Sequence, residues 1–474
     1  MALGTVAGGQ LELIPTGVGE LDRVLGGGLV PSSVTLIAGE PGIGKSTLLL
    51  QVLAGVAARG RRGLLVAAEE SPSQVGMRAA RLGITAEGIW VVGDTDLPSI
   101  RAAAAGVHPD VLVIDSIQTI SDPESGPVAG TVASVRACAS ALADEAKSGG
   151  PAVVLVGHVT KDGAIAGPRV LEHLVDTVLS FEGDRHHALR LLRAAKHRFG
   201  PVGELGMWEM TAAGLEEVPD GAAFLLADRR PGAPGSVVFA GIEGRRPLLI
   251  EVQALVAPAG GGSPRRSASG YETGRLGQLV AVLDQRAGVS LRGEDVYVSA
   301  VGGVRLADPG ADLAVALAVA SAATGRPVPA DLVVMGEVGL GGEIRQVAQS
   351  PRRLAEAVRL GFSQAVVPSG APDTPGLPTV PVDTLVEALD LVLASEPAPR
   401  PSLRVISGSG GTELGAGAPL PSGHLAGDPP SPSSLVLSPP PASSRAPGPS
   451  PAPSPAPAAS PAPSPAPASS RAPG

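Results

Sequence analysis

A nine-residue pattern in the first tenth of the chain constrains its fold more than any other feature. An apolar run over residues 34–38 precedes the pattern and a helix-like run over residues 46–53 follows, which indicates a turn from strand to helix. At such a turn, backbone N–H groups and the helix N-terminus face phosphate groups. The pattern is G-x-x-x-x-G-K-[ST], and its residues are Gly39, Glu40, Pro41, Gly42, Ile43, Gly44, Lys45, Ser46 and Thr47. The sequence therefore predicts a P-loop that binds a nucleoside triphosphate.

Two side chains of the P-loop carry most of its predicted chemistry. Lys45 is expected to reach the β- and γ-phosphates, and the Ser46 hydroxyl is expected to bind Mg²⁺. Lysine is scarce, because arginine fills nearly every other basic position and the chain has only four lysines. A compact ammonium where guanidinium is the rule indicates a site that needs a point charge. The four are Lys45, Lys147, Lys161 and Lys196.

Acidic residues end two further strand candidates in the first half of the chain. The apolar run over residues 110–115 ends in Asp115, where a P-loop enzyme places the Walker B carboxylate that orders water on Mg²⁺. The run over residues 64–68 is followed by Glu69 and Glu70. A carboxylate there can orient and deprotonate the attacking water. Glu69 is favoured as this catalytic base, and Glu70 is the alternative.

A histidine and a basic cluster follow a third strand candidate over residues 152–157. His158 stands just past the end of that strand and before a loop with glycines, so it is a candidate sensor of the γ-phosphate. An ordinary hydrogen-bonded histidine is the alternative. The downstream basic cluster is as consistent with contact to phosphate or DNA as with a solvated face. Its members are Arg185, Arg190, Arg193, Lys196 and Arg198.

Composition limits the environment and the partners of the chain. Cys138 is the single cysteine, which excludes internal disulfides and a cysteine-based zinc site and fits a reducing cytosol. The first residues do not resemble a signal peptide, and no uncharged apolar run of about 18 residues occurs, so a soluble cytoplasmic protein without membrane contact is expected. The net charge of -9 means that any nucleic-acid contact must come from a local basic surface.

The chain divides into four segments by composition. A short extension over residues 1–10 precedes a first domain over residues 11–230, whose strand and helix candidates alternate as in a parallel sheet covered by helices on both faces. A second α/β or α+β domain is expected over residues 235–395, with a break rich in glycine, proline and serine over residues 257–269. Residues 396–474 are rich in Pro, Ala and Ser and are expected to be disordered.

Several motifs in the first domain resemble those of a known family. Residues 13–31, together with the P-loop, resemble the entry to RecA-like ATPases. Residues 157–163, residues 166–173 and the segment Lys196-His197-Arg198-Phe199-Gly200 resemble signatures of the bacterial RadA (Sms) family. The resemblance covers residues 11–395. It implies an α/β fold with a RecA-like P-loop ATPase domain followed by a Lon-protease-like domain.

The resemblance also implies a function and a set of roles in the ATPase domain. RadA proteins are ATP-dependent DNA repair and recombination factors that respond to DNA damage stress and promote branch migration. By motif, Lys45 and Ser46 bind ATP and Mg²⁺, Asp115 is the Walker B residue and Glu69 is the catalytic base. Lys196 and Arg198 belong to the family's Lys-Asn-Arg-Phe-Gly motif, here with His197 in place of Asn. They are expected to couple the ATP state to DNA across a subunit boundary.

The partners implied by the resemblance are DNA and further copies of the chain. RadA proteins form hexameric rings, so a homo-hexamer on single-stranded and branched DNA and a recombinase partner of the RecA type are expected. The loop from Thr160 to Arg169, which includes Lys161, corresponds to a DNA-binding loop in the ring channel. Family members usually open with a four-cysteine zinc finger. No cysteine occurs near the start of this sequence, so zinc is not expected as a cofactor.

The second domain resembles the proteolytic domain of Lon without its catalytic pair. Lon uses a Ser-Lys dyad, and a nucleophilic serine needs an adjacent base. The position that matches Lon's serine is Gly310, and no lysine occurs after Lys196. The sequence therefore predicts a scaffold for ring assembly and DNA contact, not an ATP-dependent protease. The leading function is a DNA-dependent ATPase motor, and the alternative is an ATP-dependent assembly switch of the RecA fold.

Overall fold

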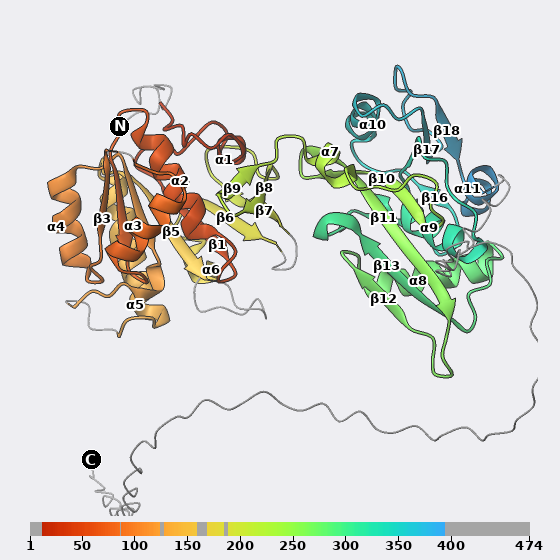
Figure 1. Cartoon of the computed structure of the whole chain (residues 1–474), viewed down its shortest axis with the longest axis horizontal. Helices are drawn as coiled ribbons and strands as arrows, with labels where there is room; N and C mark the ends of the chain where they lie inside the picture. Colours follow the sequence, from red (N-terminus) through yellow and green to blue (C-terminus); the bar gives the residue numbers. More distant parts are fainter. Residues whose placement is uncertain (1–11, 86, 124–127, 159–167, 184–187, 394–474) are drawn as a thin grey trace, which may run out of the picture. The chain divides into compact units, whose positions relative to one another are not determined.

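A computed structural model describes residues 12–85, 87–123, 128–158, 168–183 and 188–393 of the chain. These residues belong to one compact unit, Met1–Pro401. They form an α/β structure with two large sheets and helices packed against them, as the sequence predicts (Figure 1). The predicted extension over residues 1–10 and the tail over residues 396–474 lie outside the described residues.

The first sheet has nine strands in the order β3-β2-β4-β5-β1-β6-β7-β8-β9. The six strands from β3 to β6 pair in parallel with their neighbours, so the carboxyl ends of β1, β2, β4 and β5 meet at one edge. The strands of this sheet are β1 (Val34–Gly39), β2 (Gly63–Ala67), β3 (Ile89–Val92), β4 (Val111–Asp115), β5 (Ala152–His158), β6 (Thr177–Glu182), β7 (Leu189–His197), β8 (Leu205–Thr211) and β9 (Gly214–Glu217).

The predicted parallel sheet is extended at one side by antiparallel strands. Strands β6, β7, β8 and β9 pair in antiparallel fashion. Short connections join these strands, and a connection of a few residues can only return the chain antiparallel, whereas a parallel neighbour needs a longer crossover. Three members of the basic cluster, Arg190, Arg193 and Lys196, therefore lie on the antiparallel strand β7, and Arg198 directly follows it. Arg185 precedes the strand in sequence and lies outside the described residues.

Helices cover both faces of the first sheet, as predicted. Neighbouring residues of each central strand point to opposite faces, so Ile37 and Val113 pack in one core and Leu36 and Leu112 in another. The first core includes α1 (Gly19–Leu25), α2 (Lys45–Ala57) and α3 (Pro72–Arg81). The second includes α4 (Leu97–Val107), α5 (Val132–Lys147) and the end of α6 (Pro168–Leu171). The central parallel strands β1, β2, β4 and β5 are buried on both faces, which explains their continuous apolar runs.

The second sheet is mixed and has seven strands in the order β12-β13-β11-β10-β14-β17-β18. Its core contains the apolar helix α9, which is rich in Ala, Val and Leu and buried on nearly all sides. A two-stranded hairpin, β15 (Glu337–Val338) and β16 (Ile344–Arg345), lies outside this sheet. The strands of the sheet are β10 (Ser236–Glu243), β11 (Arg246–Pro258), β12 (Arg266–Ser269), β13 (Glu294–Ala300), β14 (Leu332–Val334), β17 (Gln364–Pro368) and β18 (Thr379–Val382).

The break predicted over residues 257–269 is partly regular structure. Strand β11 continues to Pro258, and the last four residues of the predicted break form β12, which pairs with β13. The helices of this part are α8 (Thr273–Arg286), α9 (Asp312–Thr324), α10 (Ser350–Arg359) and α11 (Leu385–Val392). The division into domains near residues 230–235 stays a prediction. That position falls between α7 (Gly221–Leu226) and β10.

Candidate nucleotide-binding site

The P-loop connects the carboxyl end of β1 to the start of α2. Gly44 has a φ of +118°, a left-handed conformation that favours glycine, and a Cβ there would lie 2.7 Å from the Met210 Cε. A Cβ on Gly39 would lie 2.5 Å from the Phe181 carbonyl oxygen. The glycines of the pattern are therefore required by backbone shape and by close packing. The structure places the predicted loop residues 39–47 in a single strand-to-helix turn.

Lys45 is buried at the centre of this loop. Its Nζ donates to the carbonyl oxygens of Gly39 (2.8 Å) and Glu40 (2.9 Å) and lies 3.2 Å from the His158 Nδ1. Burial lowers the pKa of the Lys45 ammonium, and the nearby charges of Asp115 and Glu69 oppose that shift. These contacts hold the ammonium at the edge where the carboxyl ends of the parallel strands meet, as a P-loop lysine requires.

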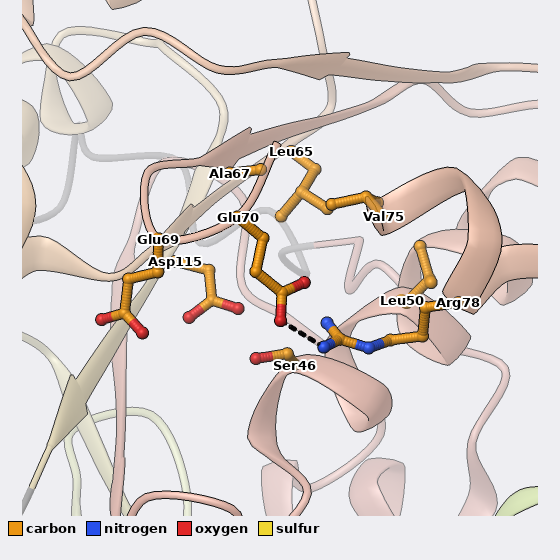
Figure 2. A pocket seen from close by; sticks show the side chains of 9 residues that line it. All are labelled: Ser46, Leu50, Leu65, Ala67, Glu69, Glu70, Val75, Arg78 and Asp115. Carbon is orange, nitrogen blue, oxygen red and sulfur yellow. Dashed lines mark hydrogen bonds and ion pairs between the residues drawn. The ribbon is translucent and has the colours of Figure 1, made fainter. Parts of the chain in front are cut away.

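Asp115 and Ser46 supply a pair of oxygen ligands beside the loop (Figure 2). Asp115 ends β4 in register with Ala67 of β2, and its carboxylate lines the same pocket as the Ser46 hydroxyl. Burial raises the pKa of Asp115, while the nearby Ser46 hydroxyl opposes the rise. Hydroxyl and carboxylate oxygens are ligands that Mg²⁺ prefers. The two residues therefore fit a Mg²⁺ ion that also contacts nucleotide phosphates.

Glu69 and Glu70 have different partners, although they are neighbours in sequence. The Ser116 hydroxyl donates to Glu69, and the His158 Nε2 lies 2.8 Å from the Glu69 Oε1. Burial raises the pKa of Glu69, but the hydrogen bonds from Ser116 and His158 outweigh it and bring that pKa below the ordinary value. Glu70 instead accepts from the Arg78 Nη2 at 2.5 Å (Figure 2). Glu69 is the carboxylate that belongs to the Lys45–His158 cluster.

His158 links the P-loop lysine to Glu69. It ends β5 in register with Gly39 at the end of β1, so the sheet itself brings it to the P-loop. Its two ring nitrogens face Lys45 on one side and Glu69 on the other. Both partners belong to the predicted nucleotide site, and the two roles considered for His158, a sensor of the γ-phosphate and an ordinary hydrogen-bonded histidine, stay predictions. The chain that follows, residues 159–167, lies outside the described residues.

Of the remaining predicted residues, some lie outside the described residues and the others lie away from this cluster. Thr160 and Lys161 lie outside the described residues, and Arg169 is placed only as a backbone position in α6. The Lys196 Nζ donates to the carbonyl oxygens of Glu172 (2.5 Å) and Val175 (2.8 Å). Burial and the nearby Arg198 lower the pKa of Lys196, against the opposing charge of Asp176.

Arg198 and Lys196 lie toward the opposite end of β1 from the P-loop. The Arg198 Nη1 lies 3.0 Å from the Asp176 Oδ1, and the other oxygen of Asp176 accepts from the backbone N–H of Val34, where β1 begins. The P-loop begins at the other end of β1, after Gly39. The structure therefore does not bring either cation to the nucleotide site of its own chain.

Three residues of the site region carry contacts that sequence reasoning missed. Ser116 binds Glu69, and its place directly after Asp115 was the only available signal. Arg78 binds Glu70 from the middle of α3. The Arg190 Nε donates to the Ile43 carbonyl oxygen of the P-loop at 3.1 Å, so this member of the basic cluster supports the loop. Arg193 of the same cluster pairs with Glu182 and Glu243.

Two searches of the described residues bear on the composition arguments. No group of three or more His, Cys, Asp or Glu side chains in those residues comes together as a metal-binding cluster. The expectation that zinc is not a cofactor stays a prediction. None of the helices in the described ranges has both the length and the apolar character needed to cross a membrane.

Comparisons with known proteins agree with the motifs and the fold. A family model described as KaiC, an ATPase, matches residues 14–91, and one described as subunit ChlI of Mg-chelatase matches residues 301–371. A DNA repair protein RadA of Pseudomonas aeruginosa is 50% identical over 394 residues, which are 82% of this chain and 87% of that protein. The chain belongs to the RadA family of DNA repair proteins.

Two further RadA proteins give the same result for other bacteria. RadA of Mycolicibacterium smegmatis is 49% identical over 79% of this chain and 81% of its own length. RadA of Halalkalibacterium halodurans is 45% identical over 81% of this chain and 85% of its own length. Membership of the RadA family and the P-loop of the first sheet together make this chain a RecA-like ATPase.

Proposed function

We propose that this RadA-family chain is a DNA-dependent ATPase of DNA repair and homologous recombination, acting as a ring-shaped homo-hexamer that promotes branch migration. The observation that carries the proposal is the convergence of Lys45, Ser46, Asp115 and Glu69 at one edge of the first sheet. Three strands that are far apart in sequence, β1, β2 and β4, place these side chains together. Each has the chemistry that one step of ATP hydrolysis requires.

The residues divide the proposed reaction between them. Lys45 and the P-loop N–H groups hold the phosphates, and Ser46 with Asp115 holds Mg²⁺, which neutralises charge on the phosphate oxygens when bound. Glu69 has a lowered pKa and is therefore ionised near neutral pH. An ionised carboxylate can orient the attacking water and accept its proton. The proton goes to Glu69 as the water oxygen bonds to the γ-phosphorus and the bond to the leaving ADP oxygen breaks.

The proposal extends to coupling with DNA. His158 contacts both Lys45 and Glu69 and directly precedes the loop that includes Thr160, Lys161 and Arg169. A γ-phosphate that binds Lys45 competes with His158 for the ammonium, so the histidine can report the nucleotide state to that loop. The proposed role of the loop is contact with single-stranded and branched DNA.

Lys196 and Arg198 are proposed to act on the nucleotide site of a neighbouring copy. Both residues lie near the start of β1, whereas their own P-loop lies at its end. This separation supports a role across a subunit boundary. Their present partners are the carbonyl groups of Glu172 and Val175 and the carboxylate of Asp176, all in the segment between α6 and β6, so movement of that segment would change which groups these cations face. We also propose that the chain acts together with a recombinase of the RecA type and that it is located in the cytoplasm.

The second sheet is proposed to be a scaffold without protease activity. Gly310, the position that matches Lon's serine, donates its N–H to Asp308 and has no side chain to act as a nucleophile. Arg353 is buried and pairs with Asp308 at 2.5 Å. An arginine stays protonated in proteins and cannot serve as a general base. Degradation of casein that requires ATP would contradict this part of the proposal.

The test is the ATPase rate measured without DNA, with single-stranded DNA and with branched DNA. Lys45→Ala is expected to abolish turnover, whereas Lys196→Ala and Arg198→Ala keep nucleotide binding and lose stimulation by DNA. Lys147→Ala is the matched control, because Lys147 is exposed on α5. If the Lys196 and Arg198 variants kept full stimulation, the coupling role would be wrong.

The alternative, an ATP-dependent assembly switch, predicts a different response to salt. A motor that contacts DNA phosphates loses affinity steeply as salt rises, because binding releases counterions. A switch that assembles around a protein partner shows little DNA binding at any salt concentration. DNA binding measured over a salt series, with and without ATP, separates the two.

A further inference from the structure

A cavity of about 630 Å³ lies in the part of the chain that carries the second sheet. Its walls come from the start of α8, the segment over residues 305–309, the start of α9 and strand β15. None of its lining residues is Ser, Thr, Cys, Lys or His. The volume falls in the range of ligand pockets, while the lining offers no hydroxyl of serine or threonine, no thiol and no lysine for a Ser-Lys type of covalent chemistry.

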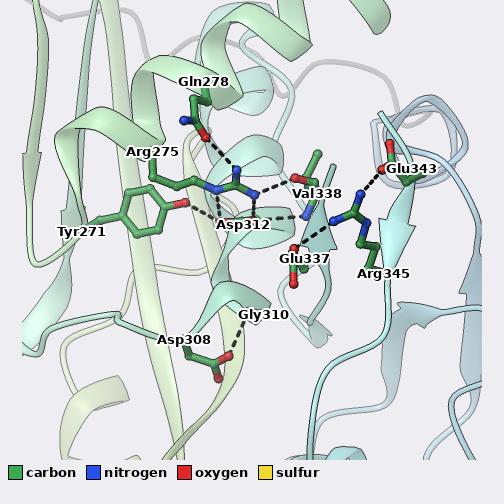
Figure 3. Close-up of polar contacts among 10 residues, drawn as sticks. All are labelled: Tyr271, Arg275, Gln278, Asp308, Gly310, Asp312, Glu337, Val338, Glu343 and Arg345. Carbon is green, nitrogen blue, oxygen red and sulfur yellow. Dashed lines mark hydrogen bonds and ion pairs between the residues drawn. The ribbon is translucent and has the colours of Figure 1, made fainter. Parts of the chain in front are cut away.

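The inner wall of the cavity is a closed set of polar contacts (Figure 3). Asp312 is 1% exposed and accepts from the Tyr271 hydroxyl at 2.5 Å, from the Arg275 guanidinium and from the Val338 N–H at 3.2 Å. The same arginine also donates to the Val338 carbonyl oxygen at 2.6 Å. A buried carboxylate with this many donors is satisfied and fixed in place. Asp312 therefore shapes the cavity without being free to hold a ligand.

The rim of the cavity carries a backbone edge. Val304 and Leu306 are buried while Arg305 and Ala307 are exposed, which is the alternation of an extended strand. Val304 and Asp308 have extended backbone angles, and the Leu306 N–H donates to the Gly270 carbonyl oxygen at 2.6 Å.

The other edge of this segment is open. N–H and C=O groups of alternate residues in an extended strand point to opposite edges, so those of Arg305 and Ala307 point away from Gly270. Within the described ranges, neither Arg305 nor Ala307 makes a backbone hydrogen bond to another backbone group. An unpaired edge of this kind is where an added strand binds.

Two charged side chains of opposite sign accompany the open edge. Arg305 and Glu272 both line the cavity and are exposed, and neither forms an ion pair with another described residue. Glu337, a third charged lining residue, already pairs with Arg345 at 3.5 Å (Figure 3). The free charges of the rim therefore complement a ligand that carries both an acidic and a basic group.

We propose that this cavity binds an extended peptide segment of a partner protein, which adds as a β-strand to the main chain of Arg305 and Ala307. An acidic side chain of the peptide pairs with Arg305 and a basic one with Glu272, and apolar side chains enter the cavity beside Leu306. We expect the peptide to be bound without cleavage, because the lining has no serine, threonine or cysteine nucleophile and no lysine or histidine base. This site is separate from the ATPase site and does not depend on the proposed motor function.

The test selects random heptapeptides displayed on phage against the full-length protein and measures the enriched peptides by fluorescence anisotropy. Ala307→Pro removes the N–H from the open edge and is expected to weaken binding about tenfold, the effect of one lost ladder hydrogen bond with local distortion. Ala307→Ser keeps the N–H and is the matched control. Arg305→Glu is expected to turn the preference from peptides with an acidic residue to peptides with a basic one.

Basal ATPase activity and thermal unfolding of each variant show that it is folded. The proposal is overturned if no peptide is enriched by the wild-type protein. It is also overturned if the enriched peptides bind Ala307→Pro and Arg305→Glu as tightly as the wild type. Release of a shortened peptide during incubation would contradict binding without cleavage.

Discussion

The Nδ1 of His158 accepts a hydrogen bond from the Lys45 ammonium across 3.2 Å, and this contact joins the end of β5 to the P-loop. The ammonium can only donate, so Nδ1 carries no proton and the neutral ring carries its proton on Nε2. That Nε2–H donates to Glu69 at 2.8 Å. One tautomer of one histidine therefore orients both the P-loop lysine and the proposed catalytic base.

Replacement of His158 should change the pH dependence of ATP hydrolysis. His158→Ala removes a hydrogen bond that holds the pKa of Glu69 below its ordinary value. Glu69 acts when ionised, and a higher pKa means that it is protonated at a higher pH, so the acid limb of the kcat profile moves upward. His158→Gln retains a polar group and should shift the limb less. An unmoved limb in His158→Ala would show that this hydrogen bond does not tune the base.

Substitution of the two neighbouring glutamates, Glu69 and Glu70, should affect the rate of ATP hydrolysis to different extents. Glu69→Gln is expected to lower kcat by about 10² or more, because the amide cannot accept the proton from water. Glu70→Gln should cost far less, since Glu70 is paired with Arg78 and does not contact His158. ATPase rates and binding of a fluorescent ATP analogue check both variants. A larger loss in Glu70→Gln would assign the base to Glu70.

The Ser46–Asp115 pair predicts a specific dependence on Mg²⁺. Ser46→Ala removes one oxygen ligand and the hydroxyl beside Asp115 that opposes the rise in the pKa of that carboxylate. The Mg²⁺ concentration for half-maximal ATPase activity should rise by about tenfold or more. A Mg²⁺ titration of the ATPase rate measures this, and chelation of Mg²⁺ should abolish activity in the wild type. Ser73→Ala, on the exposed start of α3, is a control that leaves the titration unchanged.

Two glycines, Gly44 of the P-loop and Gly76 of α3, should respond in opposite ways to the same substitution by alanine. Gly44→Ala forces a side chain into a φ of +118° and against Met210, which should cost about 1–3 kcal/mol and displace the phosphate-binding loop. Gly76→Ala lies inside α3 with no atom within 4 Å of the added Cβ, so it should stabilise by about 0.5–1 kcal/mol. Chemical unfolding measures both, and ATP binding should fail only in Gly44→Ala.

Much of the first sheet was predictable because its signals are local. Apolar runs bounded by turns predicted β1, β2, β4 and β5 within one or two residues, since strands buried on both faces need continuous apolar sequence. The antiparallel strands β7 to β9 were not predicted, and β12 was taken as part of a break. These strands are short or carry charged residues, so their pairing depends on neighbours that the local sequence does not specify.

The sequence by itself determined the P-loop, because its nine residues are contiguous and their chemistry follows from glycine conformation and one lysine. It also placed Asp115, Glu69 and His158 at strand ends. Only the tertiary structure decided which of these groups touch. The order of the strands put His158 between Lys45 and Glu69 and set Lys196 far from its own P-loop. Such contacts join residues distant in sequence, and sheet register, not local propensity, fixes them.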